Sequence, residues 1–347
     1  MAKHQKSKAI VFEGAEQVRL IEEEVPEAGA GEVLVETTVS LVSTGTECHC
    51  FAGRFDPGTT WANWVKYPFR VGYSAVGRVV QVGADVADLK EGDAVFAGKP
   101  HQQFAVVGVD QAVKLPDSVS DEAASWASLA FVVQTGVRRA EHAMGDTAVV
   151  IGLGPLGQLA VQYLRLLGLR QVLAIDTVPM RLDVAAAHGA TATFCGSAGD
   201  ARDFVGEHTD GLLADVVYDV TGHWSVLPQA LPLARDFGKI MLLGDTPQPS
   251  KQHLTHDVLG RQVAVLGTHN IKLQPQYAWW TIRRQIELFF TYVQRGQMHV
   301  DDLITHRHPP EEAPALYSRL LADRSDTLGV LFDWQERYAA SGCALGG

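Results

Sequence analysis

The sequence lacks several features that would assign it to other classes of protein. It has only four cysteines in 347 residues, Cys48, Cys50, Cys195 and Cys343, and their sparse, irregular spacing excludes a disulfide framework. Its N-terminal segment has no apolar core of the kind found in secretory signals, and the apolar runs are short and broken by Gly, Asp or Arg. These absences predict a cytoplasmic protein with no membrane span.

An excess of positive charge is also missing. Lysine and arginine number 29 against 40 acidic residues, which gives a formal net charge of -11. Nucleic acid is therefore not an expected partner, because contacts to phosphate need a basic surface. The 46% of hydrophobic residues is typical of a globular protein with a substantial core, and 347 residues are enough for two domains.

Two different patterns follow one another along the chain. Up to about residue 110, short alternating runs such as 33–41 and 74–86, separated by turns, predict a small, irregular β-barrel or sandwich. An alanine-rich segment over 121–143 then predicts a helix, with a break near Gly136. After it, nearly continuous apolar strands alternate with helices, which favours a doubly wound parallel sheet, and a further helix is expected over 277–296.

A glycine motif stands where the first of these strands meets a helix. It follows the apolar run 148–151 and reads Gly152-Leu153-Gly154-Pro155-Leu156-Gly157. The first glycine allows a tight turn, the second lets the backbone approach a pyrophosphate, and the third lets helix and strand pack closely. Proline is tolerated at a first helical position. The motif predicts a Rossmann dinucleotide site, and the alternative is a plain glycine-rich turn.

An acidic residue ends the next strand. Asp176 stands where a carboxylate accepts both ribose hydroxyls and repels a 2′-phosphate, which favours NAD over NADP. Arg181, five residues later, could instead pair with such a phosphate, and Asp176 could also serve as a helix N-cap. The ends of the later strands supply the remaining candidate cofactor contacts, Thr221, Gly244, Asp245 and Thr268.

The order of these features resembles the medium-chain dehydrogenase/reductase superfamily over about residues 8–335. A β-rich domain comes first, then Asp146, the glycine turn and Asp176, and the stretch 303–324 is also similar to the superfamily's. The resemblance implies an NAD(P)-dependent enzyme that acts on CH–OH groups of small molecules and assembles as a homodimer. It implies an α/β fold with a GroES-like catalytic domain over 1–125 and a Rossmann NAD-binding domain over 126–270. Residues 271–347 would return to the catalytic domain and form a C-terminal tail.

The zinc ligands of this superfamily are missing. Where zinc-dependent members carry C-G-T-D-x-H and G-H-E, this chain has Thr44-Gly45-Thr46-Glu47-Cys48-His49 and Gly72-Tyr73-Ser74, and the third ligand position falls at about Ser128. Hydroxyl groups are poor substitutes for thiolate or imidazole ligands. The four-cysteine lobe of a structural zinc is absent too. We therefore expect no zinc.

Four residues are the candidates for catalysis. Thr46 matches the hydroxyl that takes a proton from the substrate alcohol, and His49 matches the far end of that proton relay. Tyr73, with Thr44 second, would polarise the carbonyl in place of the metal. Each also has a structural interpretation: Thr46 could bond to backbone, His49 could be a surface or packing histidine, and Tyr73 could be a core ring.

Three functions remain open at this point. The first is reversible hydride transfer between NAD(H) and an alcohol/ketone pair, and the short motifs are similar to those of a zinc-lacking branch that includes bacteriochlorophyllide hydroxyethyl dehydrogenases. The second is reduction of activated C=C bonds, as in quinone and enoyl reductases. The third is NAD(P)H binding without turnover, as in a sensor protein. A bulky apolar substrate would suit the aromatic residues before Gly72, although most of these rings could equally be core.

Overall fold

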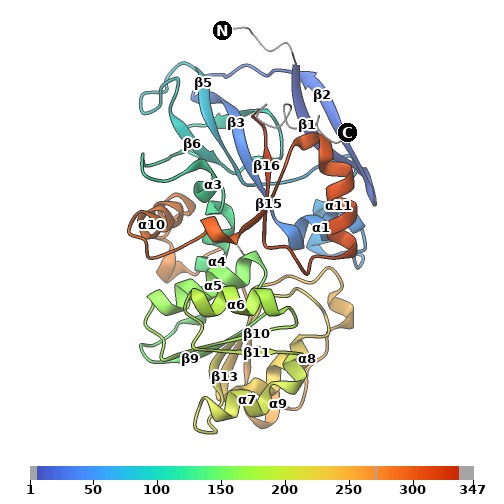
Figure 1. Ribbon diagram of the computed structural model, residues 1–347, viewed down its shortest axis with the longest axis vertical. Coiled ribbons are helices and arrows are strands. Elements are labelled where there is room, and N and C mark those ends of the chain that lie inside the picture. The colour runs from blue at the N-terminus through green and yellow to red at the C-terminus, as the bar shows by residue number, and fades with distance from the viewer. Residues whose placement is uncertain (1–5, 270–271, 336–347) are drawn as a thin grey trace, which may run out of the picture. The chain divides into compact units, whose positions relative to one another are not determined.

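The structure, a computed structural model, describes residues 6–269 and 272–335, which divide into two compact units (Figure 1). The first, the β-rich unit, comprises the described residues up to Gly53, together with 65–128 and those from Val300 onward. The second, the Rossmann unit, comprises Arg54–Trp64 and the described residues of Leu129–His299. Among the described residues, no helix has the length and apolar character needed to cross a membrane. Cys343 lies outside the described residues.

The β-rich unit is built around one long strand. Strand β3 (Glu32–Val42) pairs with β5 (Ala75–Val82), β7 (Phe104–Gly108) and β16 (Gly329–Asp333), all antiparallel. The seven-stranded sheet that contains β3 runs in the order β15-β16-β3-β5-β6-β8, with β7 paired to β3, and a second sheet has the order β2-β1-β4. The remaining elements are β1 (Lys6–Gly14), β2 (Gln17–Glu24), α1 (Thr44–Ala52), β4 (Phe69–Arg70), β6 (Ala94–Ala97), β8 (Val113–Lys114), α3 (Asp121–Ala124), β15 (Ile304–His308) and α11 (Ala313–Ala322).

The Rossmann unit contains a six-stranded parallel sheet in the order β11-β10-β9-β12-β13-β14. In chain order this is 3-2-1-4-5-6, the arrangement of a doubly wound dinucleotide-binding sheet. The strands are β9 (Thr147–Ile151), β10 (Gln171–Asp176), β11 (Ala192–Cys195), β12 (Ala214–Asp219), β13 (Ala234–Leu242) and β14 (Ala264–Gly267). The helices are α2 (Thr60–Trp64), α4 (Ala127–Ala140), α5 (Pro155–Leu166), α6 (Pro179–Ala187), α7 (Arg202–Glu207), α8 (Leu227–Ala230), α9 (Asp257–Gly260) and α10 (Ile282–Gln294).

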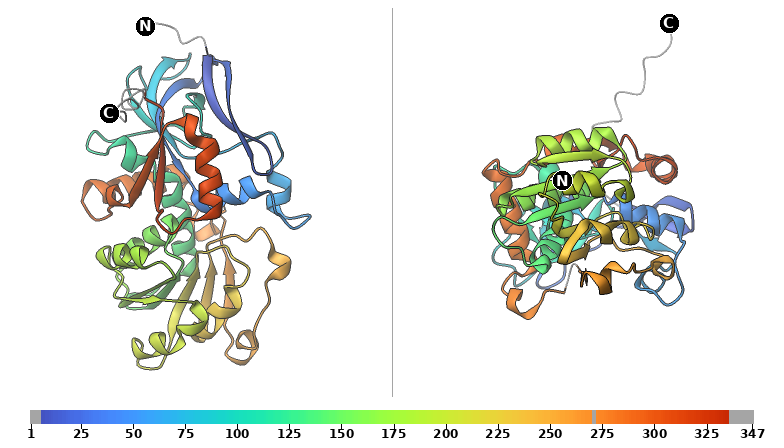
Figure 2. Two further views of the ribbon diagram at one scale, coloured as in Figure 1. Left: turned by 45° about the vertical axis from the view of Figure 1, so that its right-hand side comes forward. Right: turned by 90° about the horizontal axis from the view of Figure 1, so that it is seen from below.

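The central strands β9, β10 and β12 are buried on both faces, as predicted, because helices cover both faces of the sheet (Figure 2). On one face Val149, Leu173 and Val217 pack against Val205 of α7 and Leu227 of α8. The other face receives α5 and α6. Side chains of the sheet can therefore meet a ligand only at strand ends, where the chain turns into the next helix.

The predicted helix over 121–143 is interrupted, but not at Gly136. Ser120 is the N-cap of α3, its hydroxyl accepting a bond from the Ala123 N–H (3.1 Å), and the break falls at Ser125–Trp126. Helix α4 continues through Gly136. A Cβ there would lie 2.7 Å from the Leu243 Cδ1 atom, so this glycine allows the helix to approach the sheet closely.

The two units differ from the expected domain boundaries in two segments. Helix α10 belongs to the Rossmann unit, where the Gln134 amide of α4 donates to the Gln285 carbonyl (2.7 Å) and the rings of Tyr163 and Tyr292 lie 6.2 Å apart. Residues 54–64 also belong to it, because the Asp56 N–H donates to the Pro247 carbonyl (2.9 Å). Long-range contacts of this kind leave no periodic pattern in the sequence.

Candidate functional site

The glycine turn has the geometry that its sequence predicts. Gly152 follows β9 with a φ of +90°, and its N–H donates to the Ile175 carbonyl (2.9 Å). A Cβ on Gly157 would lie 2.0 Å from the Gly152 carbonyl oxygen, so only glycine lets α5 start this close to β9. A Cβ on Gly154 would meet nothing within 4 Å. Pro155 and Leu156 open the helix, with Pro155 at its first position. The open side of the turn can therefore receive a pyrophosphate.

Asp176 ends β10 beside this turn. One carboxylate oxygen accepts the Leu153 N–H (2.6 Å) and the other accepts the Val178 N–H (2.9 Å). The Arg181 guanidinium lies 3.9 Å from the same carboxylate. Each carboxylate oxygen has a second lone pair, so Asp176 can hold the turn and still accept ribose hydroxyls. Arg181 therefore lies beside Asp176, next to the same turn.

A second polar turn follows β12. Asp219 is 1% exposed and accepts both the N–H (3.0 Å) and the hydroxyl (2.7 Å) of Thr221. The Thr221 methyl carbon lies 2.7 Å from where a Gly152 Cβ would stand, so Thr221 packs directly on the glycine turn. The Gly244 N–H donates to the Asp219 carbonyl (2.9 Å). Burial raises the pKa of the Asp219 carboxyl to about 6.

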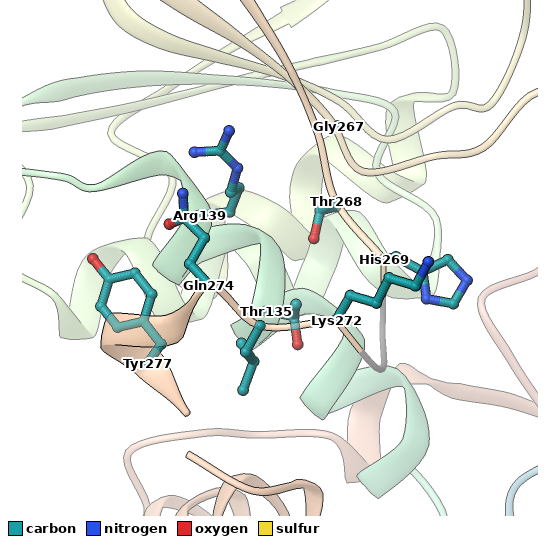
Figure 3. A pocket seen from close by; sticks show the side chains of 9 residues that line it. Thr135, Arg139, Gly267, Thr268, His269, Lys272, Gln274 and Tyr277 are labelled. Atoms are coloured by element: carbon teal, nitrogen blue, oxygen red, sulfur yellow. The ribbon is translucent and has the colours of Figure 1, made fainter. Parts of the chain in front are cut away.

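Beyond β14 the Rossmann unit has a pocket of about 360 Å³ (Figure 3). Thr268, one of the predicted cofactor contacts, lines it together with Thr135 of α4. Figure 3 shows Lys272 and His269 near one another, away from Arg139 and Tyr277. Asp245 follows β13 as an exposed residue. The predicted cofactor residues thus lie at or just after the carboxyl ends of parallel strands.

The catalytic candidates lie in the β-rich unit. Thr44, Thr46 and His49 are all on α1, and the spacing of three residues between Thr46 and His49 places them on one face of the helix. The Tyr73 hydroxyl lies 3.4 Å from the Thr46 hydroxyl, within hydrogen-bond reach but long. Burial raises the pKa of Tyr73 to about 12, so its hydroxyl stays protonated and can donate.

Two of the residues at the positions of the family's zinc ligands make hydrogen bonds within the β-rich unit. Ser128 donates to the Tyr73 carbonyl (2.6 Å), which fixes the backbone at Tyr73. The Thr44 carbonyl accepts a bond from the Arg324 guanidinium (2.8 Å). Burial raises the pKa of the Cys48 thiol to about 11 and that of Cys50 further, so both thiols are neutral. Within the described residues, no group of three or more His, Cys, Asp or Glu side chains could hold a metal ion.

Phe51, one of the aromatic residues that could have lined a pocket, is core instead, and Tyr67 is half-buried. Phe51 is 1% exposed and packs with Phe12 and Tyr317, with ring centroids 5.4 and 5.8 Å away. The Tyr67 hydroxyl donates to the Cys50 carbonyl (2.6 Å). These rings stabilise α1 rather than offer an apolar surface to a substrate.

The structure also shows a buried polar network that the sequence analysis missed. The Glu47 carboxylate, 1% exposed, accepts bonds from Tyr317 (2.6 Å) and from the Ser43 N–H (2.8 Å), and it pairs with His101 (3.0 Å). Glu47 stands at the acidic position of the family motif, which was an available signal. His101 and Tyr317 gave none, because nothing in their sequence surroundings relates them to α1.

Comparison with known proteins agrees with this arrangement. Residues 29–118 match the family profile described as alcohol dehydrogenase GroES-like domain, and residues 155–284 match the one described as zinc-binding dehydrogenase. L-threonine 3-dehydrogenase of Bacillus licheniformis is 29% identical, over 83% of this chain and 88% of its own.

Two solved structures share the fold. A Sinorhizobium meliloti protein described as a zinc-binding dehydrogenase bound to NADP has a TM-score of 0.79 at 24% identity, over 94% of this chain and 99% of that one. The alcohol dehydrogenase rspB of Escherichia coli CFT073, complexed with NADH, has a TM-score of 0.77 at 20% identity, over 95% and 100% of the two chains.

Replacing Gly157 tests the glycine turn. In Gly157→Ala the new methyl group meets the Gly152 carbonyl, so α5 must move, at a cost of about 1–3 kcal/mol in the free energy of unfolding. NADH affinity, measured by fluorescence titration, should fall at least ~10-fold as the helix N-terminus shifts. Gly206→Ala is the control, because a Cβ there meets nothing within 4 Å. Equal NADH affinity in both variants would contradict this role of Gly157.

The raised pKa of Asp219 predicts a pH-dependent stability. Between about pH 4 and 6 Asp219 is protonated in the folded protein and ionised in the unfolded chain. The free energy of unfolding therefore decreases as pH rises through the folded pKa of about 6. A shift from 3.8 to about 6 corresponds to ~3 kcal/mol. The unfolding free energy of Asp219→Asn relative to wild type should therefore rise by about that amount between pH 4 and pH 7 in urea denaturation. Asp236→Asn, at an exposed site, should show no such change.

Proposed function

The chain belongs to the medium-chain dehydrogenase/reductase superfamily, and on that premise we propose that it is an NAD(H)-dependent dehydrogenase acting on an alcohol/ketone or aldehyde pair without catalytic zinc. The observation that carries the proposal is the pair of hydroxyls of Thr46 and Tyr73, 3.4 Å apart in the β-rich unit. The glycine turn of the Rossmann unit supplies the dinucleotide site that the reaction requires.

NAD is the proposed cofactor, with NADP as the less favoured one. The residues fit a dinucleotide, because Gly154 leaves open space at the start of α5 and Asp176 ends the following strand. Asp176 would accept the ribose hydroxyls and repel a 2′-phosphate. The nicotinamide would supply the hydride acceptor in oxidation and the donor in reduction.

The protein's own side chains handle the proton and the carbonyl oxygen. The Thr46 hydroxyl is proposed to take the proton of the substrate alcohol and pass it toward His49 on the same face of α1. Tyr73 stays protonated, since burial raises its pKa to about 12, and it would donate a hydrogen bond to the carbonyl oxygen. Thr44 is the second candidate for that donor.

The donor set supports a reaction without zinc. Hydroxyl groups occupy the three positions at which zinc-dependent members carry ligands, and one of them, Ser128, already donates to the Tyr73 carbonyl. Hydroxyl oxygens are weak zinc ligands beside thiolate and imidazole. The mechanism above therefore has no step that depends on a metal.

The substrate is proposed only as a small alcohol or carbonyl compound. The L-threonine and polyol dehydrogenases among the relatives act on different alcohols, and the fold does not choose between them. The similarity of short motifs to bacteriochlorophyllide hydroxyethyl dehydrogenases is not sufficient to transfer that substrate. A cytoplasmic location stays a prediction from the sparse cysteines.

A homodimer is also proposed. Strand β14 ends the six-stranded sheet, pairing with β13 among the described strands, and its outer residues Ala264 and Gly267 are exposed. An edge strand with unpaired backbone groups is readily joined by the same strand of a second copy, which gives two-fold symmetry.

The enzyme activity is tested by a screen of alcohols, aldehydes and enones with NADH and NADPH, followed by absorbance. We expect turnover of an alcohol/carbonyl pair with a preference for NADH, and no stoichiometric zinc by metal analysis. Thr46→Val should lower kcat about 100-fold or more and leave NADH affinity unchanged. Thr291→Val, which removes a hydroxyl of α10 bonded to the Glu287 carbonyl, is the control.

Other results of the screen would favour other functions. Reduction of enones alone would indicate a C=C reductase, and tight NADH binding without any hydride exchange would indicate a sensor. Stoichiometric zinc would overturn the metal-free mechanism. An unchanged rate in Thr46→Val would exclude the proton relay.

The dimer is tested by sedimentation velocity at micromolar concentration. Wild type should sediment with twice the mass of one chain. Ala264→Lys places a charge on the exposed edge and should shift the equilibrium toward monomer. A wild-type monomer at that concentration would remove the proposal.

A further inference from the structure

The buried Glu47 network does more than fill the core beneath α1. Glu47 stands next to Thr46 in the chain and is 1% exposed, so its charge has to be compensated inside the protein. It receives hydrogen bonds from Tyr317 of α11 and from the Ser43 N–H, and it pairs with His101, which is 0% exposed. One carboxylate thereby ties three separate parts of the β-rich unit together.

The two ring nitrogens of His101 each have a hydrogen-bond partner. Its Nδ1 lies 2.7 Å from the Ser40 hydroxyl, and that same hydroxyl accepts the Trp334 indole N–H (2.9 Å). Trp334 can only donate, so the Ser40 hydroxyl is free to donate to His101 Nδ1. His101 then carries its proton on Nε2 and donates it to Glu47 (3.0 Å). The imidazole thus bridges the Ser40 hydroxyl and the Glu47 carboxylate, and both of its ring nitrogens have hydrogen-bond partners.

His101 also holds the backbone that carries Tyr73. Its own N–H donates to the Val71 carbonyl (2.8 Å). Gly72 adopts a φ of +94°, and a Cβ there would lie 2.6 Å from the His101 Cδ2 atom. The imidazole therefore lies directly against the residue before Tyr73. Only glycine combines that backbone conformation with that close contact.

Glu47 fixes the other half of the hydroxyl pair. Ser43 is the N-cap of α1, but its side chain makes no capping bond. The Glu47 carboxylate, four residues after the N-cap, instead reaches back to the Ser43 N–H (2.8 Å). The first turn of α1, which carries Thr44 and Thr46, is thus held by the same carboxylate that binds His101.

We propose that Glu47 and His101 are positioning residues that set the separation of the Thr46 and Tyr73 hydroxyls. Neither touches reacting atoms: Glu47 acts through the first turn of α1 and His101 through the backbone at Gly72. The proposal rests on the function proposed above, because it assigns a task to this pair only if both hydroxyls take part in the reaction. A purely structural network would stabilise the unit without affecting turnover per folded molecule.

The first test compares Glu47→Gln and His101→Gln with a matched control. Both changes leave polar groups without suitable partners, so the two hydroxyls move apart and kcat should fall about 10- to 100-fold. NADH affinity should stay unchanged, since the Rossmann unit is intact. Asp93→Asn removes another buried carboxylate of the same unit, one that pairs with Lys114 (2.9 Å), and it should keep the wild-type kcat. Wild-type kcat in both network variants would overturn the proposal.

A second test separates positioning from general destabilisation. In a Tyr73→Phe background one of the two hydroxyls that Glu47 and His101 position is missing. Adding Glu47→Gln should then lower kcat by less than about twofold more. If Glu47→Gln lowered kcat by the same factor in the Tyr73→Phe background as in wild type, the effect would be unrelated to this geometry and the proposal would be overturned. If Glu47→Gln does not fold, Glu47→Asp keeps the charge while shortening the side chain, and it should show a smaller loss of kcat with the same dependence on Tyr73.

A third measurement does not depend on turnover. Amide hydrogen exchange at residues 43–47 should be faster in Glu47→Gln than in wild type and in Asp93→Asn. Unchanged protection there would overturn the proposal even without a known substrate. Failure of the proposed function has a different signature, namely wild-type protein that binds NADH and turns over nothing in the screen.

Discussion

The β-rich unit depends on the burial of one charge. A carboxylate removed from water is tolerated only when hydrogen-bond donors surround it, because desolvation otherwise costs several kcal/mol. Glu47 meets this requirement with donors from three places far apart in the chain: the residue before α1, His101 before β7, and Tyr317 on α11. The unit can bury this charge only in its native arrangement. The hydrogen bonds to Glu47 therefore also fix the position of α1 within the unit.

The Rossmann unit depends on a different constraint, the close approach of backbone to backbone. A single methyl group at Gly157 would overlap the Gly152 carbonyl, and one at Gly136 would meet Leu243. Glycine at these positions lets α5 and α4 lie tightly against the sheet. This close packing determines the path of the glycine turn, and Asp176 stabilises the turn by accepting the Leu153 N–H (2.6 Å). The same contacts that stabilise the fold leave the start of α5 open to an anion.

Sequence patterns predicted the parts of this structure that depend on local periodicity. The glycine turn, the parallel strands and Asp176 at the end of β10 are all signalled within about 30 residues. The break in the helix after α3 was misplaced at Gly136, because glycine also serves close packing. His101 could not be found at all. Its partners Ser40 and Glu47 are 61 and 54 residues away, and such contacts have no sequence signature.

In the proposed zinc-free site, Glu47, the acidic residue of the family motif, has the task of positioning the Thr46 and Tyr73 hydroxyls. A metal polarises a carbonyl with its charge, whereas a metal-free site must do so with neutral donors held in place beforehand. Tyr73 suits the role of fixed donor, because a phenol with a pKa of about 12 does not give up its proton. In the proposed mechanism the proton travels by another group, and that role is assigned to Thr46, whose hydroxyl lies 3.4 Å from that of Tyr73. Two hydroxyls with separate roles require a fixed separation, and a rigid, buried pair such as Glu47 and His101 is the means available in this unit.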